Sequence, residues 1–323
     1  VITGVNVSAP TGASADVGTH VITAADGGAD NYFTNHVAGT LTVDKAAALT
    51  ITADNQSKVY GAADPSLTWT GSGTLYYGET YTGVITGVNL SAPTGAAATV
   101  GTHVITSADG TADNYFTDNA NGTLDVTQAS LTVTADDKGK TYGGAEPPLT
   151  YTPSGTLYYG DTYSVITGVS LDTQIGPLAT AGVHVINASG GTAVNYDITH
   201  VPGELTVAKS DTVEVIADNK AKVYGAADPS LSSVTTGTFF YGDDPAAVVT
   251  GITLDTQTGA AATAGTHAIN VSGSTAANYI ITETAGTLTV TKAPALTITA
   301  DNQTKTYGAA EPPLTYTPSG ILY

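Results

Sequence analysis

The sequence predicts an all-β fold, a tandem array of small immunoglobulin-like β-sandwich repeats. Three observations support this prediction. A segment of 19 residues occurs four times along the chain of 323 residues, which indicates internal repeats. Within each repeat, apolar residues alternate with polar ones, and a period of two is typical of strands. Glycine, proline, asparagine and aspartate interrupt these runs, as they do at turns between short strands.

The repeated segment sets the length of the unit at about 82 residues. It begins at Leu49, Leu131, Val213 and Leu296, with spacings of 82, 82 and 83 residues. Both ends of the chain fall inside a repeat, so we expect an excerpt from a longer array. The sequence is therefore divided into the C-terminal part of a repeat, three complete repeats and the N-terminal part of another: 1–48, 49–130, 131–212, 213–295 and 296–323.

The first complete repeat illustrates the predicted strands. Leu49, Ile51 and Ala53 alternate with polar residues and predict the first strand, while Leu124 and Val126 predict the last. Short strands are predicted between them over 58–60, 67–70, 84–90, 102–106 and 114–117. About seven strands in some 80 residues are expected for a small sandwich. A β-grasp repeat with one minimal helix is the alternative, because weakly marked strands can conceal a helical turn.

The junctions between repeats are short. The last predicted strand of one repeat ends at Val126 and the next repeat begins at Leu131, without a Gly–Ser run between them. Such a linker leaves little room for free movement. The sequence therefore predicts a semi-rigid array.

Composition excludes several classes of function. The chain has no cysteine, which removes disulfides, thiol catalysis and cysteine-ligated zinc. Nine basic residues against 28 acidic ones give a net charge of −19, which argues against nucleic acid and anionic membrane surfaces as partners. No apolar stretch is long enough to insert in a membrane. No paired carboxylates, nucleophile with its base, or metal-ligand set is confined to one repeat, so we do not expect an enzyme.

The strongest local motif is Lys-x-Tyr-Gly followed by an acidic residue and proline. In the first complete repeat it consists of Lys58, Tyr60, Gly61, Asp64 and Pro65, and it returns in each later copy of the segment. Glycine supplies a turn with positive φ, and proline fixes the next turn. The tyrosine is expected to pack its ring while its hydroxyl finds a partner. The motif is therefore interpreted as structural.

Together with other recurrent motifs, this one resembles the MBG/YDG-type repeats. The motifs are Tyr-Gly-x-x-[Asp/Glu]-Pro-x-Leu, a later Gly-[Asp/Glu], Val-Gly-Thr-His-Val-Ile, Asn-Tyr and Gly-Thr-Leu-x-Val. The resemblance covers the whole chain. It implies a multi-repeat stalk or adhesin of bacterial surface proteins similar to filamentous haemagglutinin, with no catalytic residues to carry over. His103 and the aromatic pair Tyr76–Tyr77 depart from the residues expected at their positions.

An aromatic loop is the candidate contact site. Neighbouring residues of a strand point to opposite faces, so one ring of each pair is expected in the core. The other ring either is also core or forms an exposed patch that stacks on sugars or on a neighbouring chain. The candidate loop residues are Tyr76, Tyr77, Tyr81, Tyr158, Tyr159, Tyr163, Phe240 and Tyr241.

Two further series recur once per repeat. The histidines lie at predicted strand starts and are interpreted as half-buried strand residues, because a metal or acid–base site needs several converging partners. They are His20, His103, His184 and His267. Acidic residues near the junctions leave Ca²⁺ as the one cofactor to consider, although no Asp-x-Asp-x-Asp loop is present. They are Asp54, Asp136, Asp218 and Asp301.

These observations lead to two expectations about function. The first is a non-catalytic extracellular array that serves as a semi-rigid stalk or adhesin segment at a bacterial cell surface. Its partner would be a surface glycan or a protein receptor, bound weakly and many times. The alternative is a self-assembling filament or sheath subunit, in which strand edges or the Tyr-rich loops join copies of the chain.

Overall fold

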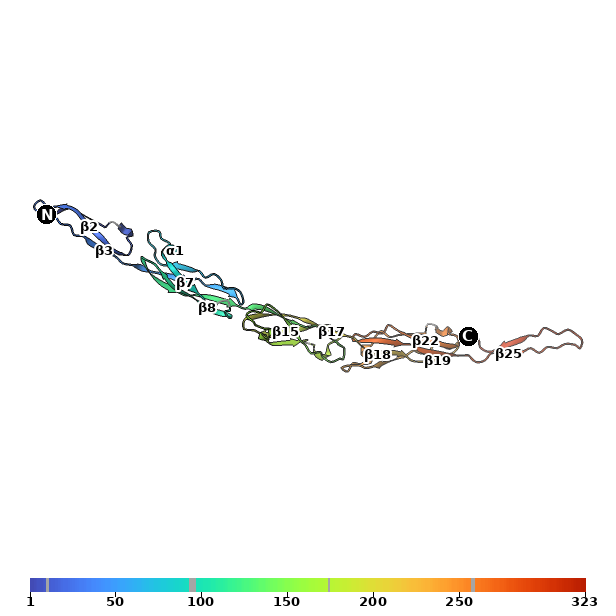
Figure 1. Cartoon of the computed structure of the whole chain (residues 1–323). Helices are drawn as coiled ribbons and strands as arrows, with labels where there is room; N and C mark the ends of the chain where they lie inside the picture. The colour runs from blue at the N-terminus through green and yellow to red at the C-terminus, as the bar shows by residue number, and fades with distance from the viewer. Residues whose placement is uncertain (10–11, 93–96, 174, 257–258) are drawn as a thin grey trace. The chain divides into compact units, whose positions relative to one another are not determined.

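The computed structural model describes residues 1–9, 12–92, 97–173, 175–256 and 259–323, and these residues form short strands joined by turns (Figure 1). Within these described residues, each of the three complete repeats has seven strands, divided between a three-stranded and a four-stranded sheet. Two sheets with about seven strands are the architecture of an immunoglobulin-like sandwich. The predicted all-β array of small sandwich repeats is therefore confirmed.

The chain divides into two compact units. The first comprises residues 1–133, 153–170 and 190–200, and it contains repeat 49–130 whole. The sheets of that repeat have the strand orders β6-β4-β9 and β5-β10-β8-β7, and residues 1–48 form a sheet of order β1-β2-β3. Its strands are β1 (Thr3–Ser8), β2 (Gly18–Gly28), β3 (Gly39–Val43), β4 (Ala46–Ala53), β5 (Gln56–Val59), β6 (Trp69–Ser72), β7 (Thr86–Ser91), β8 (Gly101–Thr111), β9 (Tyr115–Ala120) and β10 (Gly122–Thr127).

The second unit comprises residues 134–152, 171–189 and 201–323, and it contains repeat 213–295. The sheets of that repeat have the orders β20-β18-β23 and β19-β24-β22-β21, and β25 pairs with β26. Its strands are β12 (Lys138–Thr141), β17 (Gly203–Ala208), β18 (Ser210–Ala217), β19 (Lys220–Val223), β20 (Ser233–Gly237), β21 (Thr253–Asp255), β22 (Gly265–Ser272), β23 (Tyr279–Thr284), β24 (Gly286–Thr291), β25 (Thr297–Ala300) and β26 (Tyr316–Ser319).

Residues 131–212 are divided between the two units. Their sheets have the orders β13-β11-β16 and β12-β17-β15-β14, the same arrangement as in the other complete repeats. The strands that include residues of both units are β11 (Ala129–Ala135), β13 (Tyr151–Gly155), β14 (Thr167–Asp172), β15 (Gly182–Thr192) and β16 (Tyr196–Val201).

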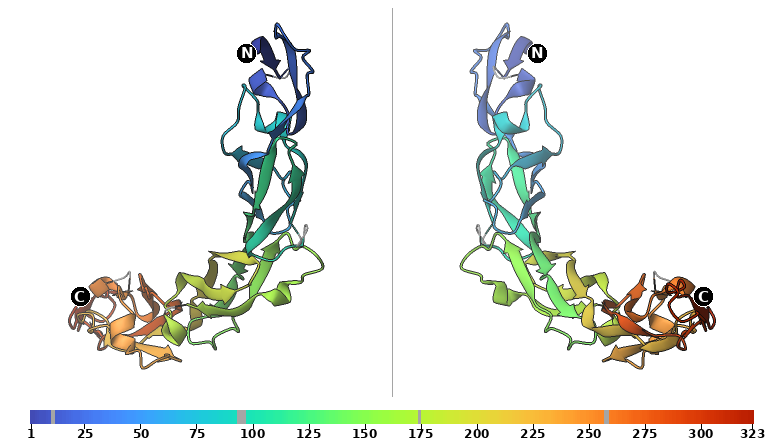
Figure 2. Two further views of the ribbon diagram at one scale, coloured as in Figure 1. Left: turned by 90° about the vertical axis from the view of Figure 1, so that its left-hand side faces the viewer. Right: turned by 90° about the vertical axis from the view of Figure 1, so that its right-hand side faces the viewer.

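The core of repeat 49–130 follows from the alternation along β4. Leu49, Ile51 and Ala53 are buried, while the threonines between them are partly exposed. β4 pairs antiparallel with β6 and parallel with β9, and β7 pairs antiparallel with β8. Figure 1 labels β7 and β8, and Figure 2 shows the same ribbon from two further sides. The two sheets approach closely at Gly110 on β8, where a Cβ atom would lie 2.4 Å from Cδ1 of Ile51. Burial of these apolar side chains between the sheets is the main source of stability.

Several element boundaries differ from the prediction. Residues 81–84 form the one-turn helix α1 (Tyr81–Val84), because the Thr80 carbonyl accepts hydrogen bonds from the Gly83 and Val84 amides, so β7 begins later than predicted. The helix α2 (Pro245–Val248) takes the same place in its repeat, with Pro245 at its start and the Asp244 side chain as its cap. Four-residue helices cannot cover a sheet, so the β-grasp alternative does not describe these repeats. The 3₁₀ turns are η1 (Gly12–Ser14), η2 (Tyr163–Val165), η3 (Gly176–Leu178) and η4 (Gly259–Ala261).

Candidate functional site

The Lys-x-Tyr-Gly motif lies at one end of its repeat. β5 pairs in parallel with β10, with Lys58 opposite Val126, and the Tyr60 amide donates to the Thr127 carbonyl at 2.8 Å. The Lys58 ammonium contacts the Asp64 carboxylate at 2.6 Å, and the lysine side chain is only 3% exposed. This ion pair closes the turn that follows the strand. The motif therefore has the structural role that the sequence indicates, and it places Tyr60 at the boundary with the next repeat.

Tyr60 is buried by aromatic residues of the following repeat. Its ring centroid lies 6.1 Å from that of Tyr158, 5.5 Å from Tyr159 and 5.4 Å from Tyr196, with the ring planes between 75° and 89° apart. Edge-to-face pairs of this kind contribute about 0.5–1.5 kcal/mol each beyond the area they bury. The side chain of Tyr60 is 5% exposed as a result. We call Tyr60 and its four partners, Tyr158, Tyr159, Asp161 and Tyr196, the tyrosine junction.

Hydrogen bonds fix the orientation of these rings. The hydroxyls of Tyr60 and Tyr196 both donate to Oδ2 of Asp161, at 3.2 and 2.8 Å. The Tyr196 oxygen in turn accepts a hydrogen bond from the Tyr158 amide at 3.0 Å. Burial, assisted by the hydrogen bond to Asp161 and opposed by the bond from the Tyr158 amide, raises the pKa of Tyr196 from 10.0 to about 12. The phenols therefore stay protonated and act as donors at neutral pH.

Gly61 allows the close approach of the two repeats. Its φ is +88°, and a Cβ atom at this position would lie 2.3 Å from Cγ of Tyr158. No side chain fits in that space. In the Tyr-Gly pair, the tyrosine supplies a buried ring. The glycine lets Tyr158 of the next repeat approach the backbone.

The aromatic loop of the following repeat is a tight turn with an unfavourable backbone. Tyr159 has a φ of 54° and Gly160 a φ of 87°, and the Asp161 amide donates to the Tyr158 carbonyl at 2.9 Å. These features define a type I′ turn, which glycine and asparagine usually occupy. The left-handed conformation costs a tyrosine about 1–2 kcal/mol. Contact of the Tyr159 ring with Tyr60 offsets this cost.

The same junction occurs in the second unit. Tyr142 contacts the rings of Phe240, Tyr241 and Tyr279 at 6.3, 5.4 and 5.4 Å. Its hydroxyl and that of Tyr279 donate to Oδ2 of Asp243, at 3.0 and 2.7 Å. A Cβ on Gly143 would lie 2.2 Å from Cγ of Phe240, and one on Gly225 would lie 2.2 Å from Cγ of Tyr323. The arrangement is therefore a property of the repeat.

A second line of contacts crosses the junctions that precede residues 49, 131 and 213, beside the aromatic residues. A single residue, Gln128, separates β10 from β11, and its amide donates to the carbonyl of Tyr196 at 3.1 Å. Nearby, Oδ1 of Asn195 accepts from the Val100 amide at 3.1 Å. The other junctions repeat this pattern, through Lys209 with Ala276, Asn278 with Ala181, Lys45 with Ala112, and Asn114 with Val17.

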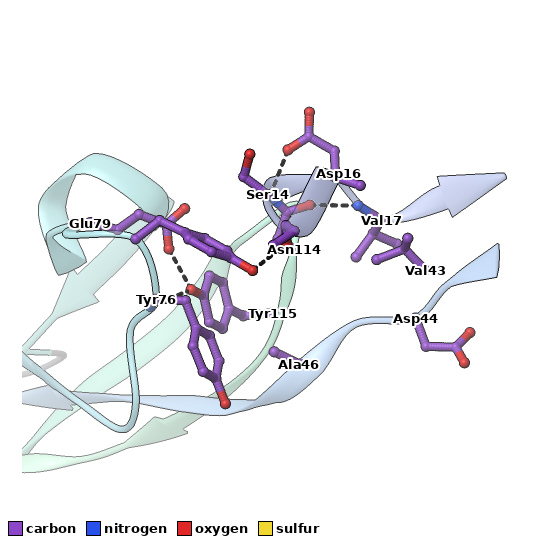
Figure 3. Close-up of a pocket in the computed structure, with 13 residues that line it drawn as sticks. Ser14, Asp16, Val17, Val43, Asp44, Ala46, Tyr76, Glu79, Asn114 and Tyr115 are labelled. Carbon is purple, nitrogen blue, oxygen red and sulfur yellow. Dashed lines mark hydrogen bonds between the residues drawn. The ribbon is translucent and has the colours of Figure 1, made fainter. Parts of the chain in front are cut away.

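The first junction, between residues 1–48 and repeat 49–130, contains a cavity of about 410 Å³ (Figure 3). Tyr76 and Tyr115 line it with stacked rings, 6.4 Å between centroids, and the Tyr115 hydroxyl donates to Glu79. The Tyr77 hydroxyl donates to the carbonyl of Ala13. Asn114 donates to Asp16 at 3.0 Å, as Figure 3 shows.

The structure divides the candidate loop residues into two groups. Those of the tight turn lie at the junctions: Tyr76, Tyr77, Tyr158, Tyr159, Phe240 and Tyr241. Tyr81 and Tyr163 instead bond within their own repeats, donating to the carbonyls of Gly73 and Gly155 at 2.8 and 3.0 Å. Sequence reasoning missed the junction roles of Tyr196 and Asp161. Their recurrence in step with the Tyr-Gly motif was the available signal.

The recurrent histidines and aspartates lie in local hydrogen bonds. His103 is half-buried on β8, as predicted, and its Nε2 lies 2.7 Å from the Thr99 carbonyl; the other members of the series make the same contact. The Thr68 and Thr70 hydroxyls donate to Asp54 and hold the pKa of its carboxyl below the usual value. Threonine hydroxyls at the equivalent positions donate to Asp136 and Asp301, and the Ser232 hydroxyl donates to Asp218. Within the described ranges, no three His, Asp or Glu side chains converge in a way that would hold a metal ion.

Fold and junction together define a tandem-repeat β-sandwich protein whose neighbouring repeats meet through aromatic side chains. The family model described as MBG domain (YGX type) matches residues 49–125, 131–206, 213–289 and 296–323. These segments cover more than half of the chain, so the chain belongs to the MBG domain (YGX type) family, as its motifs predict.

Other comparisons give only distant likenesses. Among proteins with curated descriptions, none matches the sequence. Drosophila N-cadherin EC1-4 is 9% identical with a TM-score of 0.26, covering 85% of this chain and 83% of its own. Protocadherin Gamma B2 domains 1–5 is 13% identical with a TM-score of 0.22, covering 88% of this chain and 66% of its own. Sidekick-1 immunoglobulin domains 1–4 is 10% identical with a TM-score of 0.19, covering 63% and 61%. At these TM-scores the likeness carries no argument about function.

Proposed function

We propose that this chain is a non-catalytic segment of an extracellular stalk or adhesin at a bacterial surface, in which the tyrosine junction holds neighbouring repeats in a fixed relation. The observation that supports it is the recurrence of the junction. Tyr60 and Tyr142 enter the same set of aromatic and acidic partners, one in each unit. Contacts that recur at successive junctions fit a mechanical role in the array. A recognition site would be expected in one repeat only.

The linker and the aromatic contacts act together. A linker of one residue, Gln128, is too short for the repeats to swing apart while β10 and β11 stay paired in their sheets. Three ring contacts around Tyr60, at about 0.5–1.5 kcal/mol each, then oppose bending and twisting. The chain would therefore hold an attached binding region at a distance from the cell, because its repeats bend little relative to their neighbours.

The partner of such an array would be a surface glycan or a protein receptor. Repeated weak contacts along an array give avidity without a strong single site. Tyr159 and Tyr241 remain partly exposed beside the junction, where an aromatic edge is available for stacking. A glycan array probed with the whole chain would test this; no binding to any glycan would remove the lectin-like form of the proposal.

The fixed relation between repeats has a direct test. Because the chain has no cysteine, Thr86→Cys and Thr167→Cys introduce a unique pair of spin-label sites at equivalent exposed positions of consecutive repeats. Double electron–electron resonance should give a narrow distance distribution for this pair. Adding Tyr60→Ala should broaden it, whereas Tyr163→Phe, which affects a bond within one repeat, should not. An equally broad distribution with and without Tyr60 would refute the proposal.

The second candidate function is a self-assembling filament subunit. The Tyr159 and Tyr241 rings, each nearly half exposed in equivalent turns of two repeats, favour it because they offer aromatic contacts to a second copy of the chain.

A further inference from the structure

The tyrosine junction brings phenol rings of two consecutive repeats close together. Tyr60 belongs to repeat 49–130, while Tyr159 and Tyr196 belong to the repeat that follows. The ring centroid of Tyr60 lies 5.5 Å from that of Tyr159 and 5.4 Å from that of Tyr196. Phenol rings in contact are the substrates of oxidative coupling, in which the ring carbons beside the two hydroxyls form a bond. The junction therefore places the reactants for a covalent link between repeats.

The composition of the chain directs oxidation toward tyrosine. Sulfur side chains are common targets of oxidants, and this chain has neither cysteine nor methionine. It contains 18 tyrosines and one tryptophan, Trp69, which is partly buried. An oxidant that meets this chain therefore reacts mainly with exposed tyrosine rings.

Tyr159 is the ring of the junction that an oxidant reaches first. It is 49% exposed, whereas Tyr60 and Tyr196 are 5% and 2% exposed. Exposure also leaves the Tyr159 ring room to move toward Tyr60. The two ring planes are 75° apart, and a bond between two aromatic rings leaves their planes twisted. Tyr196 has less freedom, because its hydroxyl donates to Asp161 and accepts from the Tyr158 amide.

Asp161 supplies the proton acceptor that oxidation of Tyr60 requires. A phenol that loses an electron also loses its proton, so a buried phenol is oxidised more easily beside a proton acceptor. Oδ2 of Asp161 accepts the hydrogen bond from the Tyr60 hydroxyl at 3.2 Å. A radical formed on Tyr159 can therefore pass to Tyr60, because an electron moves between the adjacent rings while the Tyr60 proton moves to Asp161.

The second unit contains every group that this reaction needs. The Tyr142 ring lies 5.4 Å from that of Tyr241, which is 46% exposed, and the Tyr142 hydroxyl donates to Asp243 at 3.0 Å. Phe240 takes the place that Tyr158 has in the first unit. The ring that differs between the two junctions is thus one that the coupling does not use.

We propose that a one-electron oxidant, such as a haem peroxidase supplied with hydrogen peroxide, joins Tyr60 to Tyr159 and Tyr142 to Tyr241 as dityrosine cross-links. The partner in this reaction is an oxidising enzyme, and its product is a covalent bond across each junction. The inference therefore goes beyond a stalk or adhesin whose repeats are held by packing alone.

The coupling balances as follows in the first unit. The oxidant takes an electron from Tyr159, which releases its phenolic proton to solvent. The radical takes an electron from Tyr60 and a proton from water, while the Tyr60 proton passes through Asp161 to solvent. A second oxidation of Tyr159 leaves a phenoxyl radical on each ring, and the two rings join through one Cε carbon each. Each joined carbon then gives up its hydrogen as a proton and each phenol oxygen takes one up, which restores both aromatic rings. In all, two electrons and two protons leave the pair, and one molecule of hydrogen peroxide takes them up to form two molecules of water.

Peptide mapping of the whole chain tests the proposal. The chain is treated at low concentration with a haem peroxidase and hydrogen peroxide, then unfolded and cleaved after lysine, which puts Tyr60 in peptide 59–138 and Tyr159 in peptide 141–209. Mass spectrometry should find these two peptides joined, at the sum of their masses less two hydrogen atoms, and fragmentation should place the bond between Tyr60 and Tyr159. Peptide 223–292 should be joined to 141–209 in the same way. Separate peptides throughout would overturn the proposal.

Two variants test the placement of the bond. Tyr159→Phe keeps the ring beside Tyr60 but removes the phenol, so it should abolish the joining of peptides 59–138 and 141–209. Tyr163→Phe is the matched control, because Tyr163 is an exposed tyrosine of the same peptide that bonds within its own repeat. It should leave the yield of joined peptides unchanged, and an unchanged yield in Tyr159→Phe would overturn the assigned bond. The spin-label experiment uses the chain before oxidation, so the cross-link and the fixed relation between repeats can fail separately.

Discussion

The hydroxyl of Tyr60 donates to Oδ2 of Asp161, a residue 101 positions further along the chain, at 3.2 Å. The hydroxyl of Tyr142 makes the same bond to Asp243 across the same separation of 101 positions, at 3.0 Å. In both places the bond joins the end of one repeat to the aromatic turn of the next. The effects of changing these residues should therefore report on the coupling of repeats.

Tyr60→Phe should lower the free energy of unfolding by about 0.5–1.5 kcal/mol, the usual net contribution of one hydrogen bond. Asp161 keeps its bond from Tyr196, so no buried acceptor is left without a donor. Tyr60→Ala should cost about 3–5 kcal/mol, because it also empties the space among the rings. Urea denaturation followed by tryptophan fluorescence measures both, since the one tryptophan, Trp69, lies in the same repeat. Equal losses for the two variants would contradict the assigned role of the ring.

Gly61→Ala should destabilise the chain by about 1–3 kcal/mol more than Gly308→Ala does. The two glycines share the Tyr-Gly motif and have φ values of +88° and +84°, so the backbone strain of an alanine is the same. Only Gly61 faces an aromatic ring, that of Tyr158, and the difference isolates this contact. Thermal unfolding at low protein concentration is the measurement. Identical melting temperatures for the two variants would show that the contact contributes nothing.

Alkaline pH should weaken the junctions. Burial, assisted by Asp161 and Asp243, raises the pKa of Tyr196 and Tyr279 from 10.0 to about 12. The folded chain thus holds these phenol protons more tightly than the unfolded chain does. Each phenol therefore adds on the order of 3 kcal/mol to the free energy of unfolding below pH 10, and this contribution is lost as the pH rises through about 12.

Ultraviolet absorbance at 295 nm measures this titration. The wild-type chain should show a group of tyrosines that ionises late, near pH 12, and this late step should disappear in the double variant Tyr196→Phe, Tyr279→Phe. A single transition near pH 10 in the folded wild-type chain would count against the buried junction.

Asp64→Ala should cost about 2–4 kcal/mol, because it removes the carboxylate partner of an ammonium whose side chain is only 3% exposed. Glu311→Ala is the matched control. Its partner Lys305 is 43% exposed, and an exposed ion pair contributes about 0–1 kcal/mol. Chemical denaturation of the two variants gives the comparison, and a similar loss in both would mean that burial of Lys58 is unimportant.

The repeat, its strands and its class were predictable because they depend on local pattern. The alternation of Leu49, Ile51 and Ala53 is sufficient to place a strand and its buried face. The motif around Tyr60 also led us to expect that its ring is packed and that its hydroxyl has a hydrogen-bond partner. The sequence did not identify which residue accepts the hydrogen bond from the Tyr60 hydroxyl.

Repetition itself concealed that partner. Every repeat carries an equivalent acidic residue, so pattern alone does not distinguish Glu79 of the same repeat from Asp161 of the next as the acceptor for Tyr60. Which acidic residue accepts the bond depends on how two neighbouring sandwiches pack together, and that packing joins residues about a hundred positions apart in the sequence. The tight turn was not predicted either. Tyr159 has a left-handed backbone conformation, and tyrosine seldom occupies that position in a type I′ turn.

The single residue between β10 and β11 has a consequence for load. With only Gln128 between them, tension on one strand passes directly to the other. β10 is held by the parallel strand β5, and β4 by the parallel strand β9. A force along these strands would have to slide one strand of each pair past its partner. All the hydrogen bonds of the pair resist that movement at the same time, instead of opening one after another. This geometry gives the paired strands resistance to rupture when the chain is pulled along its length.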